Sequence, residues 1–590
     1  MCGVCGTYSP NGQVDRSIAA AMHNRLVHRG PDETYSLNTE TVSVKLGRLG
    51  MTGLVDGWQP AEDRSGRYVA MTNGEVYNAK ALREKVGSDR QRNAVDVAVI
   101  PELVSRYGIQ GLGLVDGQFA TVVFDRAENS LILARDRFGI CPLYYTVAGS
   151  DIHFCSELKP LVQCVDQPWK VDIGAVDQYF SLGNIVAPRT LVKGVNAVPP
   201  GCAVRFGPDR QETVRYWRYG QFAPAPEPVS EEALREGLRS SVRDRLHADV
   251  EIGAYLSGGF DSTAILMESA ALLDRPVRTF SVVFDDPSLD EGRFQREVAE
   301  QVGSKHEQIL CQPTDIASRF EEMVRHCCYP QRETYNVAAM MLADTVRSFG
   351  VKGVVSGEGA DELFFGYDSY AFDSATRSTR SSCAENEQAW GRADFSWEVD
   401  WRKVSRRREH LASAAHEALV GEEFWRTRLI PFSEDEVKLL SPMQLRSISD
   451  VYVQLAGHLL GDHGDAMVMK SSIEGRYPFL GNSVVSLALQ TGDSAKVVDF
   501  EGKACLKSAY QGVVPESVLR RGKHGFTAYD LRSVVDERTW EGWRGLVEAS
   551  GVFAPGCLDT APGQGGADKW DFRLSLISIA MVMDELALGL

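Results

Sequence analysis

The sequence predicts two domains of different fold class: an α+β domain with stacked antiparallel sheets, then an α/β domain with a parallel sheet and a helical C-terminal part. Three observations lead to this prediction. Short alternating apolar runs dominate the first 200 residues, and a Pro-rich stretch at 221–229 reads as an interdomain linker. Beyond residue 231, strand and helix patterns alternate, as in βαβ units. A chain of 590 residues is long enough for more than one domain.

In the first domain, the alternating runs at 42–46, 119–124 and 130–134 predict strands, because alternate side chains of a strand face one core. Residues 16–26 predict a helix. Pro199-Pro200-Gly201 predicts a turn near the end of the domain.

The pattern of the second domain predicts strands that alternate with helices, and the last strand of this series is expected at 351–355. The expected helices are 231–247, 262–273, 292–302, 315–326 and 336–349. The strands expected before the one at 351–355 are 252–256, 277–283 and 307–310. From about residue 360 the chain is expected to be mostly helical. Residues 370–430, with Arg406-Arg407-Arg408, are expected to form a solvated insertion without a function of their own.

The composition excludes several function classes. Lys and Arg number 63 against 80 Asp and Glu, so a net charge of −17 argues against a nucleic-acid binder or a protein of anionic membrane surfaces. No apolar run reaches the length of a membrane span, and the N-terminus lacks the plan of a signal peptide. The twelve cysteines lack the spacing of a disulfide framework or a structural metal site, which favours a reducing cytoplasm.

Cys2 is the first candidate catalytic residue. If Met1 is removed, Cys2 carries a thiol and a free α-amine, which together provide a nucleophile and a base. The alternatives are a buried structural cysteine, or a Cys2–Cys5 pair with redox or metal character.

A candidate anion-binding loop follows the strand expected at 252–256. Two glycines let the backbone turn tightly, the following helix presents its N-terminus, and serine hydroxyls add donors. The residues are Leu256, Ser257, Gly258, Gly259, Phe260, Asp261 and Ser262. The segment resembles the loop of ATP pyrophosphatases, and no Walker-type loop is present, so γ-phosphate transfer is not indicated.

A second, acidic loop, Ser356-Gly357-Glu358-Gly359-Ala360-Asp361-Glu362, follows the strand expected at 351–355. Carboxylates next to pyrophosphate require Mg²⁺ between them, so Asp261 and Asp361 are the candidate metal ligands. Glu358 is a candidate base for an incoming amine. The alternative is a cluster of acidic residues that merely stabilises the start of a helix.

At this point the chain resembles the asparagine synthetase B family, which are glutamine-dependent class II amidotransferases. The resemblance covers nearly the whole chain, with its motifs in order. They are Cys2 to Gly6, His28 to Asp32, Asn73 to Asn78, Arg135 to Gly139, Ser257 to Ser262, Ser356 to Glu362 and Glu474 to Leu480. The resemblance implies an N-terminal-nucleophile glutaminase domain at 2–220 and an ATP-pyrophosphatase synthetase domain at 230–590. It also allows a homodimer.

The resemblance implies roles only at matching positions. Cys2 would attack glutamine and release ammonia, and Asn73 and Gly74 would form the oxyanion hole. ATP would adenylate a carboxylic acid, and ammonia from an internal tunnel would displace AMP. The remaining matches are Arg48, Glu75 and Asp96 for glutamine, Val282 for adenine, and Lys503 for the charge at the reacting centre.

The acceptor segment departs from the family pattern, because Ala338 to Met341 stand where polar residues are usual. An aspartate substrate buried in this pocket would need oppositely charged partners for its charged groups, and Ala and Met cannot supply them. Met467 to Ser472 and Gly481 also depart from the pattern. The hypothesis is therefore an acid other than aspartate, and the alternative is a true asparagine synthetase.

Three other functions compete. An intramolecular cyclase has no use for ammonia, so the intact Cys2 argues against it. An amidotransferase that feeds a sugar phosphate has no need of the two glycine loops. A catalytically silent binding protein would not be expected to keep Cys2, the nucleotide loop and Lys503 together.

Overall fold

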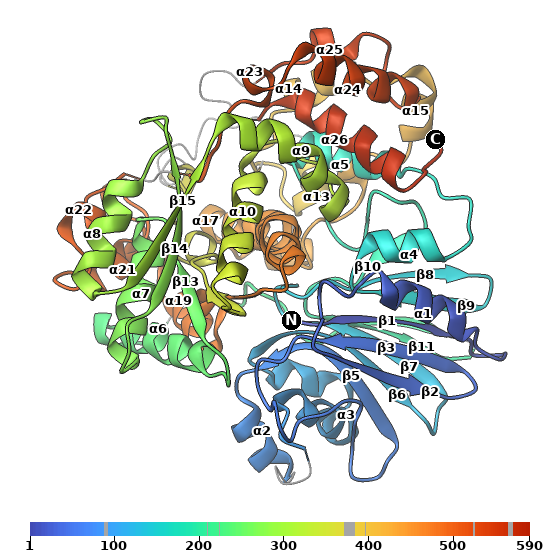
Figure 1. The fold of residues 1–590 in the computed structure, drawn as a ribbon, viewed down its shortest axis with the longest axis horizontal. Helices are drawn as coiled ribbons and strands as arrows, with labels where there is room; N and C mark the ends of the chain where they lie inside the picture. Colours follow the sequence, from blue (N-terminus) through green and yellow to red (C-terminus); the bar gives the residue numbers. More distant parts are fainter. Residues whose placement is uncertain are drawn as a thin grey trace.

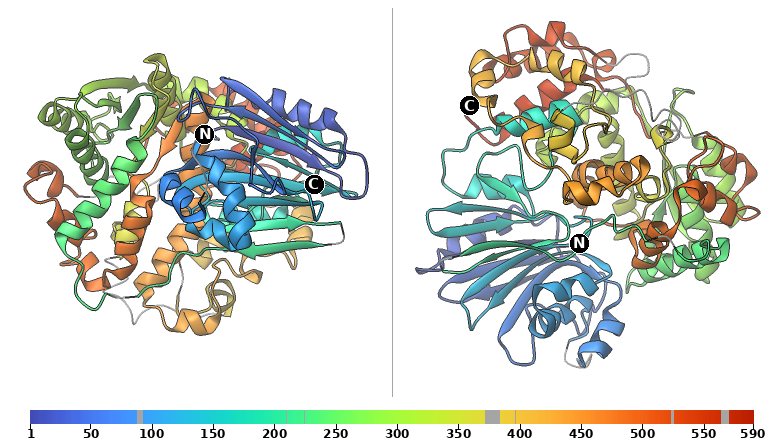
Figure 2. Two further views of the ribbon diagram at one scale, coloured as in Figure 1. Left: turned by 90° about the horizontal axis from the view of Figure 1, so that it is seen from below. Right: turned by 180° about the vertical axis from the view of Figure 1, so that it is seen from behind.

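The computed structural model describes residues 1–87, 93–208, 210–223, 225–370, 384–395, 397–522, 525–563 and 570–590. Figure 1 shows two parts side by side: a pair of stacked sheets, and a third sheet surrounded by helices. The N-terminus lies at the junction of the two parts in both views of Figure 2.

The first part contains two six-stranded antiparallel sheets. The first sheet has the order β10-β8-β9-β1-β3-β2 and the second has the order β12-β11-β7-β6-β5-β4. The strands are β1 (Gly3–Tyr8), β2 (Glu33–Asn38), β3 (Val42–Arg48), β4 (Ala61–Glu62), β5 (Tyr68–Val76), β6 (Gly117–Asp125), β7 (Ser130–Arg135), β8 (Tyr144–Ala148), β9 (Asp151–Cys155), β10 (Val195–Ala197), β11 (Cys202–Phe206) and β12 (Gln211–Arg215).

Period-two alternation explains how these sheets stack. On β5, Val69 and Met71 belong to the core shared with β1 and β3, whereas Ala70 belongs to a separate core on the other face. Helices cover both outer faces: α1 (Arg16–Asn24) and α4 (Leu158–Cys164) on the first sheet, and α2 (Ala79–Val86) and α3 (Ile100–Tyr107), with the short helices η2 (Asp96–Val99) and η3 (Gly108–Leu114), on the second. The predicted α+β domain of stacked antiparallel sheets is confirmed.

The second part contains a five-stranded parallel sheet of order β15-β14-β13-β16-β17, which confirms the predicted α/β class. Its strands are β13 (Ile252–Tyr255), β14 (Arg278–Phe284), β15 (Lys305–Cys311), β16 (Gly353–Val355) and β17 (Glu474–Arg476). The strand expected at 351–355 does not end the series, because β17 joins from more than a hundred residues further on and pairs with β16.

Helices pack around this sheet, with α8 on one side and α10 on the other (Figure 1). The helices of this part that precede residue 370 are α6 (Glu231–Leu246), α7 (Phe260–Leu272), α8 (Gly292–Val302), α9 (Pro313–Cys327), α10 (Tyr335–Ser348) and α11 (Ala360–Phe364). Those that follow are α13 (Ala384–Trp390), α14 (Trp401–Arg408), α15 (Ser413–Leu419), η4 (Phe424–Arg426), α16 (Glu434–Lys438), α17 (Pro442–Ser449), η5 (Asp450–Asp465), α18 (Ala466–Lys470), η6 (Pro478–Leu480), α19 (Asn482–Gln490), α20 (Asp493–Lys496), α21 (Ala504–Ala509), α22 (Glu516–Leu519), α23 (Leu531–Val534), α24 (Glu537–Ala549), α25 (Cys557–Thr560) and α26 (Phe572–Glu585). The C-terminal part is mostly helical, as predicted.

The prediction of a solvated insertion is wrong for the described part of 370–430; residues 371–383 and 396 lie outside the described residues. Helix α14 packs on α5 (Ile173–Leu182) of the first part. Arg407 is buried, and its guanidinium carbon lies 3.6 Å from the centre of the Trp570 ring. Arg408 donates to both oxygens of Asp177 at 2.6 and 2.8 Å. Arg407 and Arg408 therefore join the two parts, whereas Arg406 is exposed.

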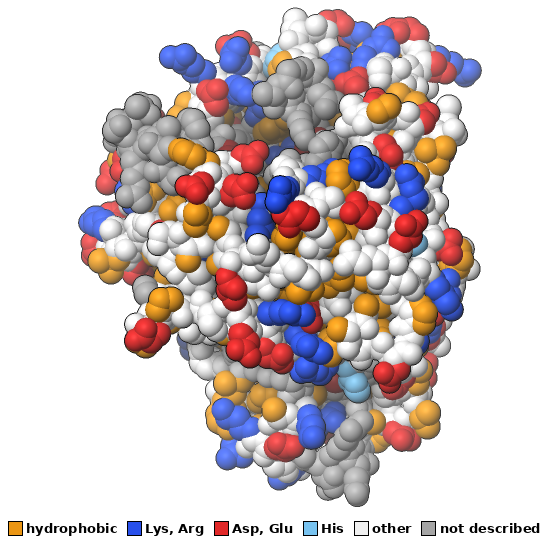
Figure 3. Space-filling model, turned by 90° about the vertical axis from the view of Figure 1, so that its left-hand side faces the viewer, with side chains coloured by type: hydrophobic (Ala, Val, Ile, Leu, Met, Phe, Trp, Pro, Cys, Tyr) orange, Lys and Arg blue, Asp and Glu red, His pale blue; other side chains and the backbone are white. Residues whose placement is uncertain are grey.

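Acidic and basic side chains are interspersed on the face shown in Figure 3, where the described residues form no continuous basic area. Within the described ranges, no helix is both long and apolar enough to cross a membrane.

Two candidate active sites

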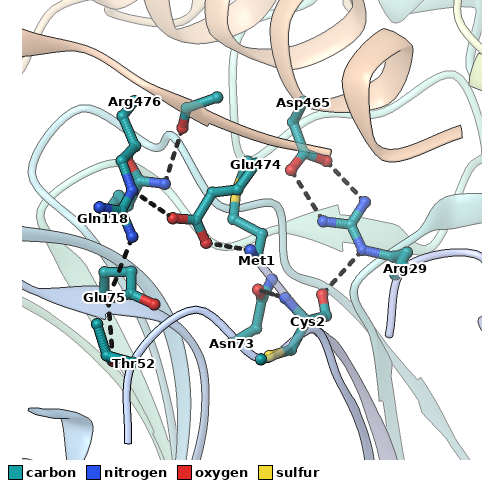
Figure 4. Close-up of polar contacts among 12 residues, drawn as sticks. Met1, Cys2, Arg29, Thr52, Asn73, Glu75, Gln118, Asp465, Glu474 and Arg476 are labelled. Atoms are coloured by element: carbon teal, nitrogen blue, oxygen red, sulfur yellow. Dashed lines mark hydrogen bonds and ion pairs between the residues drawn. The ribbon is translucent and has the colours of Figure 1, made fainter. Parts of the chain in front are cut away.

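Cys2 lies directly before β1, at the junction of the two parts (Figure 4). Its residue exposure is 6%, and burial raises the pKa of its thiol. Its backbone N–H donates to Asn73 Oδ1 at 2.5 Å. Arg29 Nε donates to the Cys2 carbonyl at 3.0 Å. The candidate nucleophile is thus fixed from both sides of its backbone.

Asn73 and Gly74 lie side by side on β5, opposite β6. Asn73 Nδ2 is buried and has no hydrogen-bond partner among the described residues, so a donor is left unused next to Cys2. Gly74 has φ of 140°, and a Cβ there would lie 2.0 Å from the Gln118 carbonyl oxygen. Only glycine permits this close approach of β5 to β6.

Two carboxylates lie beside this donor. The Thr52 hydroxyl lies 3.4 Å from Glu75 Oε2 and 3.1 Å from Asp96 Oδ1. Burial raises the pKa of both carboxyl groups, and the pKa of Glu75 is raised further by the charge of Asp96. An ammonium group placed between them would relieve both effects, so the pair can bind an amino group.

Arg48 makes its hydrogen bonds to Glu33 and to the neighbouring loop. It donates to Glu33 at 2.7 Å and to the carbonyl oxygens of Thr52, Gly53 and Gly57 at 2.7, 2.9 and 3.1 Å. It therefore holds the loop that carries Thr52. A direct contact between Arg48 and the α-carboxylate of glutamine remains a prediction.

Met1 occupies the space between Cys2 and the second part of the chain. Met1 is 1% exposed, and its amino group pairs with Glu474 of β17. Arg476 Nε lies 2.7 Å from Glu474 Oε1, and Arg476 Nη2 lies 3.5 Å from Glu75 Oε2 (Figure 4). A free α-amine on Cys2 forms only when Met1 is removed, and its removal also clears buried space beside the thiol.

The sequence analysis missed the roles of Glu474, Arg476, Arg29 and Asp465. Arg29 donates to both oxygens of Asp465 at 2.7 and 2.8 Å, which joins the first part of the chain to η5. The sequence offers one signal for these roles, because the charged residues stand in short runs between apolar segments. Charged side chains are seldom buried among apolar ones unless they are paired.

The second site is a cavity of about 640 Å³ at the carboxyl ends of β13, β14 and β16. Of the residues predicted to contact ATP or the reacting groups, those that line the cavity are Leu256, Ser257, Gly259, Asp261, Ser262, Val282, Ser356, Gly357, Glu358, Asp361 and Lys503. Gly258 does not line it. Its φ of 76° instead allows the turn between β13 and α7.

The first loop is ordered by its own hydroxyl groups. The Ser257 and Ser262 hydroxyl oxygens are 3.0 Å apart, and the Gly259 N–H donates to Ser257 Oγ at 3.2 Å. The acidic loop touches it, because a Cβ on Gly357 would lie 3.1 Å from Asp261 Cβ. The two glycine loops therefore form one continuous wall.

Lys503 bridges the two loops. Its Nζ lies 2.6 Å from Asp261 Oδ2 and 2.7 Å from Asp361 Oδ1. Burial alone would lower the pKa of Lys503, but the two carboxylates raise it above its usual value. The three candidate residues, predicted from segments far apart in the sequence, are brought together. The carboxylate of each aspartate already faces one positive charge, the Lys503 ammonium. Both carboxylates therefore fit the role of Mg²⁺ ligands beside a bound polyphosphate.

Glu358 differs from these aspartates. Its Oε2 is buried without a hydrogen-bond partner among the described residues, and burial raises the pKa of its carboxyl group. A carboxyl group of raised pKa that lines a cavity is a candidate for accepting or donating a proton there.

One end of the cavity is mostly apolar and aromatic. Ala339 and Leu342 of α10 face it, together with Met467 and Val468 of α18, and Phe526. Arg332 and Glu333 also line the cavity, and their closest nitrogen and oxygen are 3.8 Å apart.

Comparison with known proteins gives two family matches. The glutamine amidotransferase domain model matches residues 1–217, and the asparagine synthase model matches residues 233–579. Among curated proteins, asparagine synthetase [glutamine-hydrolyzing] 1 of Bacillus subtilis is 28% identical over 89% of this chain and 87% of that protein. Amidase chyE of Penicillium rubens is 31% identical over 63% of this chain and 60% of that protein.

A solved structure titled as the allosteric regulatory enzyme of purine biosynthesis aligns with 53% of this chain and 80% of that chain, at 13% identity. Its TM-score of 0.29 is too low to support a conclusion. The asparagine synthase model, in contrast, matches more than half of the residues, and so this chain belongs to the asparagine synthase family.

Proposed function

We propose that this chain is a glutamine-dependent, ATP-consuming amidotransferase that converts a carboxylic acid into its amide. The observation that carries the proposal is the convergence of two glycine loops and Lys503 on one cavity, while Cys2 and an unused amide donor lie at a second site on the same chain. Residues 2–220 are assigned to glutamine hydrolysis and residues 230–590 to amide formation.

At the first site, the Cys2 thiolate attacks the side-chain amide carbon of glutamine. The C–N bond breaks, ammonia leaves, and water later cleaves the glutamyl thioester. The α-amine exposed by removal of Met1 takes the thiol proton. Asn73 Nδ2, the buried donor without a partner, stabilises the oxyanion together with the Gly74 backbone.

Glutamine is held by its charged end. Its ammonium fits between Glu75 and Asp96, because both carboxyl groups have raised pKa values when no cation lies between them. Arg48 and the loop that it fixes lie near enough to the same site to contribute to binding the α-carboxylate.

At the second site, a carboxylate oxygen of the acid attacks the α-phosphorus of ATP, and pyrophosphate leaves. Ser257, Ser262 and the N-terminus of α7 supply donors to the phosphates. Mg²⁺ held at Asp261 and Asp361 would supply positive charge to the pyrophosphate. Lys503 neutralises charge at the same point, and Val282 lies on the wall where the adenine fits.

We further propose that the acid is less polar than aspartate. Free aspartate would bring one ammonium and two carboxylates to a wall formed largely by Ala339, Leu342, Met467 and Val468. Leaving one charge unpaired there would cost several kcal/mol. Aspartate remains the second candidate, because Arg332 and Glu333 lie on the same wall and relatives of this chain are named asparagine synthetases.

Two further features fit this function. A reducing cytoplasm would keep the Cys2 thiol free, in agreement with the eleven described cysteines, which are all unpaired. A homodimer would leave both sites intact, since each is built within one chain.

The first prediction separates the two sites. In Cys2→Ala, glutamine hydrolysis falls by about a thousandfold or more because the nucleophile is lost, whereas the reaction with ammonium as nitrogen donor stays within about twofold. Amide formation is measured with each donor. Cys5→Ala, on the same buried strand, is the matched control and retains both reactions. Glutaminase activity retained in Cys2→Ala would contradict the assignment.

The second prediction concerns pH. Because the pKa of Glu75 is raised, the empty site loses its negative charge as pH falls, so the KM for glutamine rises towards low pH. Glu75→Gln raises KM about tenfold near neutral pH and flattens this dependence, because one charged acceptor of the ammonium is lost. Steady-state glutaminase assays from pH 5.5 to 8.5 measure both effects.

Glu62→Gln, which alters an exposed carboxylate on β4, is the control and keeps the wild-type pH profile. An unchanged KM and an unchanged pH profile in Glu75→Gln would show that Glu75 does not bind the glutamine ammonium.

The third prediction concerns the acid. In a panel of carboxylic acids tested with ATP, Mg²⁺ and glutamine, acids with an apolar or aromatic body give pyrophosphate release at least about tenfold faster than aspartate, because the acceptor wall offers them contact area without unpaired charge. Pyrophosphate and amide are followed together. If aspartate were the only acid of the panel that gave pyrophosphate release, the chain would be an asparagine synthetase instead.

A further inference from the structure

Tyr335 and His458, which line the cavity, form with Asp462 a chain of three buried, hydrogen-bonded side chains. The Tyr335 hydroxyl contacts His458 Nε2, and His458 Nδ1 lies 2.8 Å from Asp462 Oδ1. Tyr335 begins α10, and the other two residues lie on η5. Their exposures are 7%, 6% and 5%, so these groups exchange protons with each other more readily than with solvent.

Asp462 fixes the direction of the chain. Its Oδ2 accepts from Gln331 Nε2 at 3.3 Å and from Asn336 Nδ2 at 3.0 Å, which stabilises the ionised carboxylate. Its Oδ1 is therefore the acceptor for His458 Nδ1–H. This hydrogen-bond pattern assigns the neutral tautomer of His458 in which Nε2 holds the lone pair and accepts the Tyr335 O–H.

Tyr335 and His458 both line the cavity that also contains Glu358 and Lys503. The Tyr335 oxygen donates its proton to His458 and keeps lone pairs that can accept a hydrogen bond from a group in the cavity. The order of carboxylate, imidazole and hydroxyl is the one that moves a proton from a hydroxyl to an imidazole in hydrolytic triads.

The neighbouring His463 does not compete with His458 for the Tyr335 proton. The His463 ring lies 5.1 Å from the Tyr335 ring, and burial, with a smaller contribution from His458, lowers the pKa of His463 to about 4, so it stays neutral. Arg332 and Glu333, which precede Tyr335, are the charged groups on its other side. Burial, followed by the charge of Glu333, raises the pKa of Tyr335, so the hydroxyl keeps its proton until a donor arrives.

We propose that Tyr335, His458 and Asp462 form a proton relay for the amide-forming step; this rests on the proposed function. As the nitrogen of ammonia bonds to the acyl carbon and the C–O bond to AMP breaks, the nitrogen must lose one proton. That proton passes to the Tyr335 oxygen, and the Tyr335 proton passes to His458 Nε2. Asp462 stabilises the imidazolium, which returns its proton to the departing AMP or to water. Tyr335 is the catalytic residue, and His458 and Asp462 act through it.

The relay is tested by measuring two steps separately. Exchange of labelled pyrophosphate into ATP reports adenylation, and amide formation with ammonium chloride reports the later step. With the best acid of the panel, Tyr335→Phe lowers amide formation by about a hundredfold and leaves exchange within about threefold. His458→Gln and Asp462→Asn give smaller losses.

Tyr452→Phe is the matched control, because it removes a buried tyrosine hydroxyl on η5 that accepts from the Tyr219 backbone N–H, and it retains both rates. Melting temperatures check that each variant folds. A parallel loss of exchange and amide formation in Tyr335→Phe, or no loss in either, would overturn the relay. Absence of acid-dependent exchange in the wild type would overturn the proposed function and the relay with it.

Discussion

The structure depends on a set of buried ion pairs whose partners come from opposite parts of the chain. Arg29 of the first part binds Asp465 of the second, and Arg476 of β17, which also pairs with Glu474, reaches Glu75. Arg29, Glu474 and Arg476 are fully buried. Buried charges are stable only when they are paired, and loss of one partner costs about 3–5 kcal/mol. Neither part can therefore present a complete set of paired charges without the other.

This constraint brings the two active sites together through a single strand. The side chains of β17 point towards Cys2 and Glu75, while its backbone holds the acidic loop: the Ser356 N–H donates to the Arg476 carbonyl at 2.9 Å. Gln118 of β6 donates to the Gly475 carbonyl at 2.9 Å. The two candidate sites thus share three residues of backbone. In the proposed function, this places the source of ammonia against the wall of the cavity in which it is used.

Sequence patterns predicted the elements whose information is local. The βαβ alternation, the two glycine loops and the candidate Cys2 follow from spacing and residue type, whereas Asn73 and Lys503 were expected only from the resemblance to the asparagine synthetase B family. Strand β17 could not be predicted in this way, since three residues with a central glycine lack a strand pattern. Arg407 and Arg408 appeared solvated because Trp570 and Asp177, which bury them, lie more than 150 residues away. Likewise, Tyr335 and His458 are separated by 123 residues.

The central claim is that glutamine nitrogen passes between two sites that these ion pairs hold in contact. The most direct test supplies glutamine labelled with ¹⁵N in its side-chain amide, together with ATP, the acid and an excess of unlabelled ammonium. Mass spectrometry of the amide product measures the label. The account predicts that the product carries the label in nearly the proportion of the glutamine, because ammonia stays inside the molecule. A product whose label is diluted to the level of the ammonium in solution would contradict it.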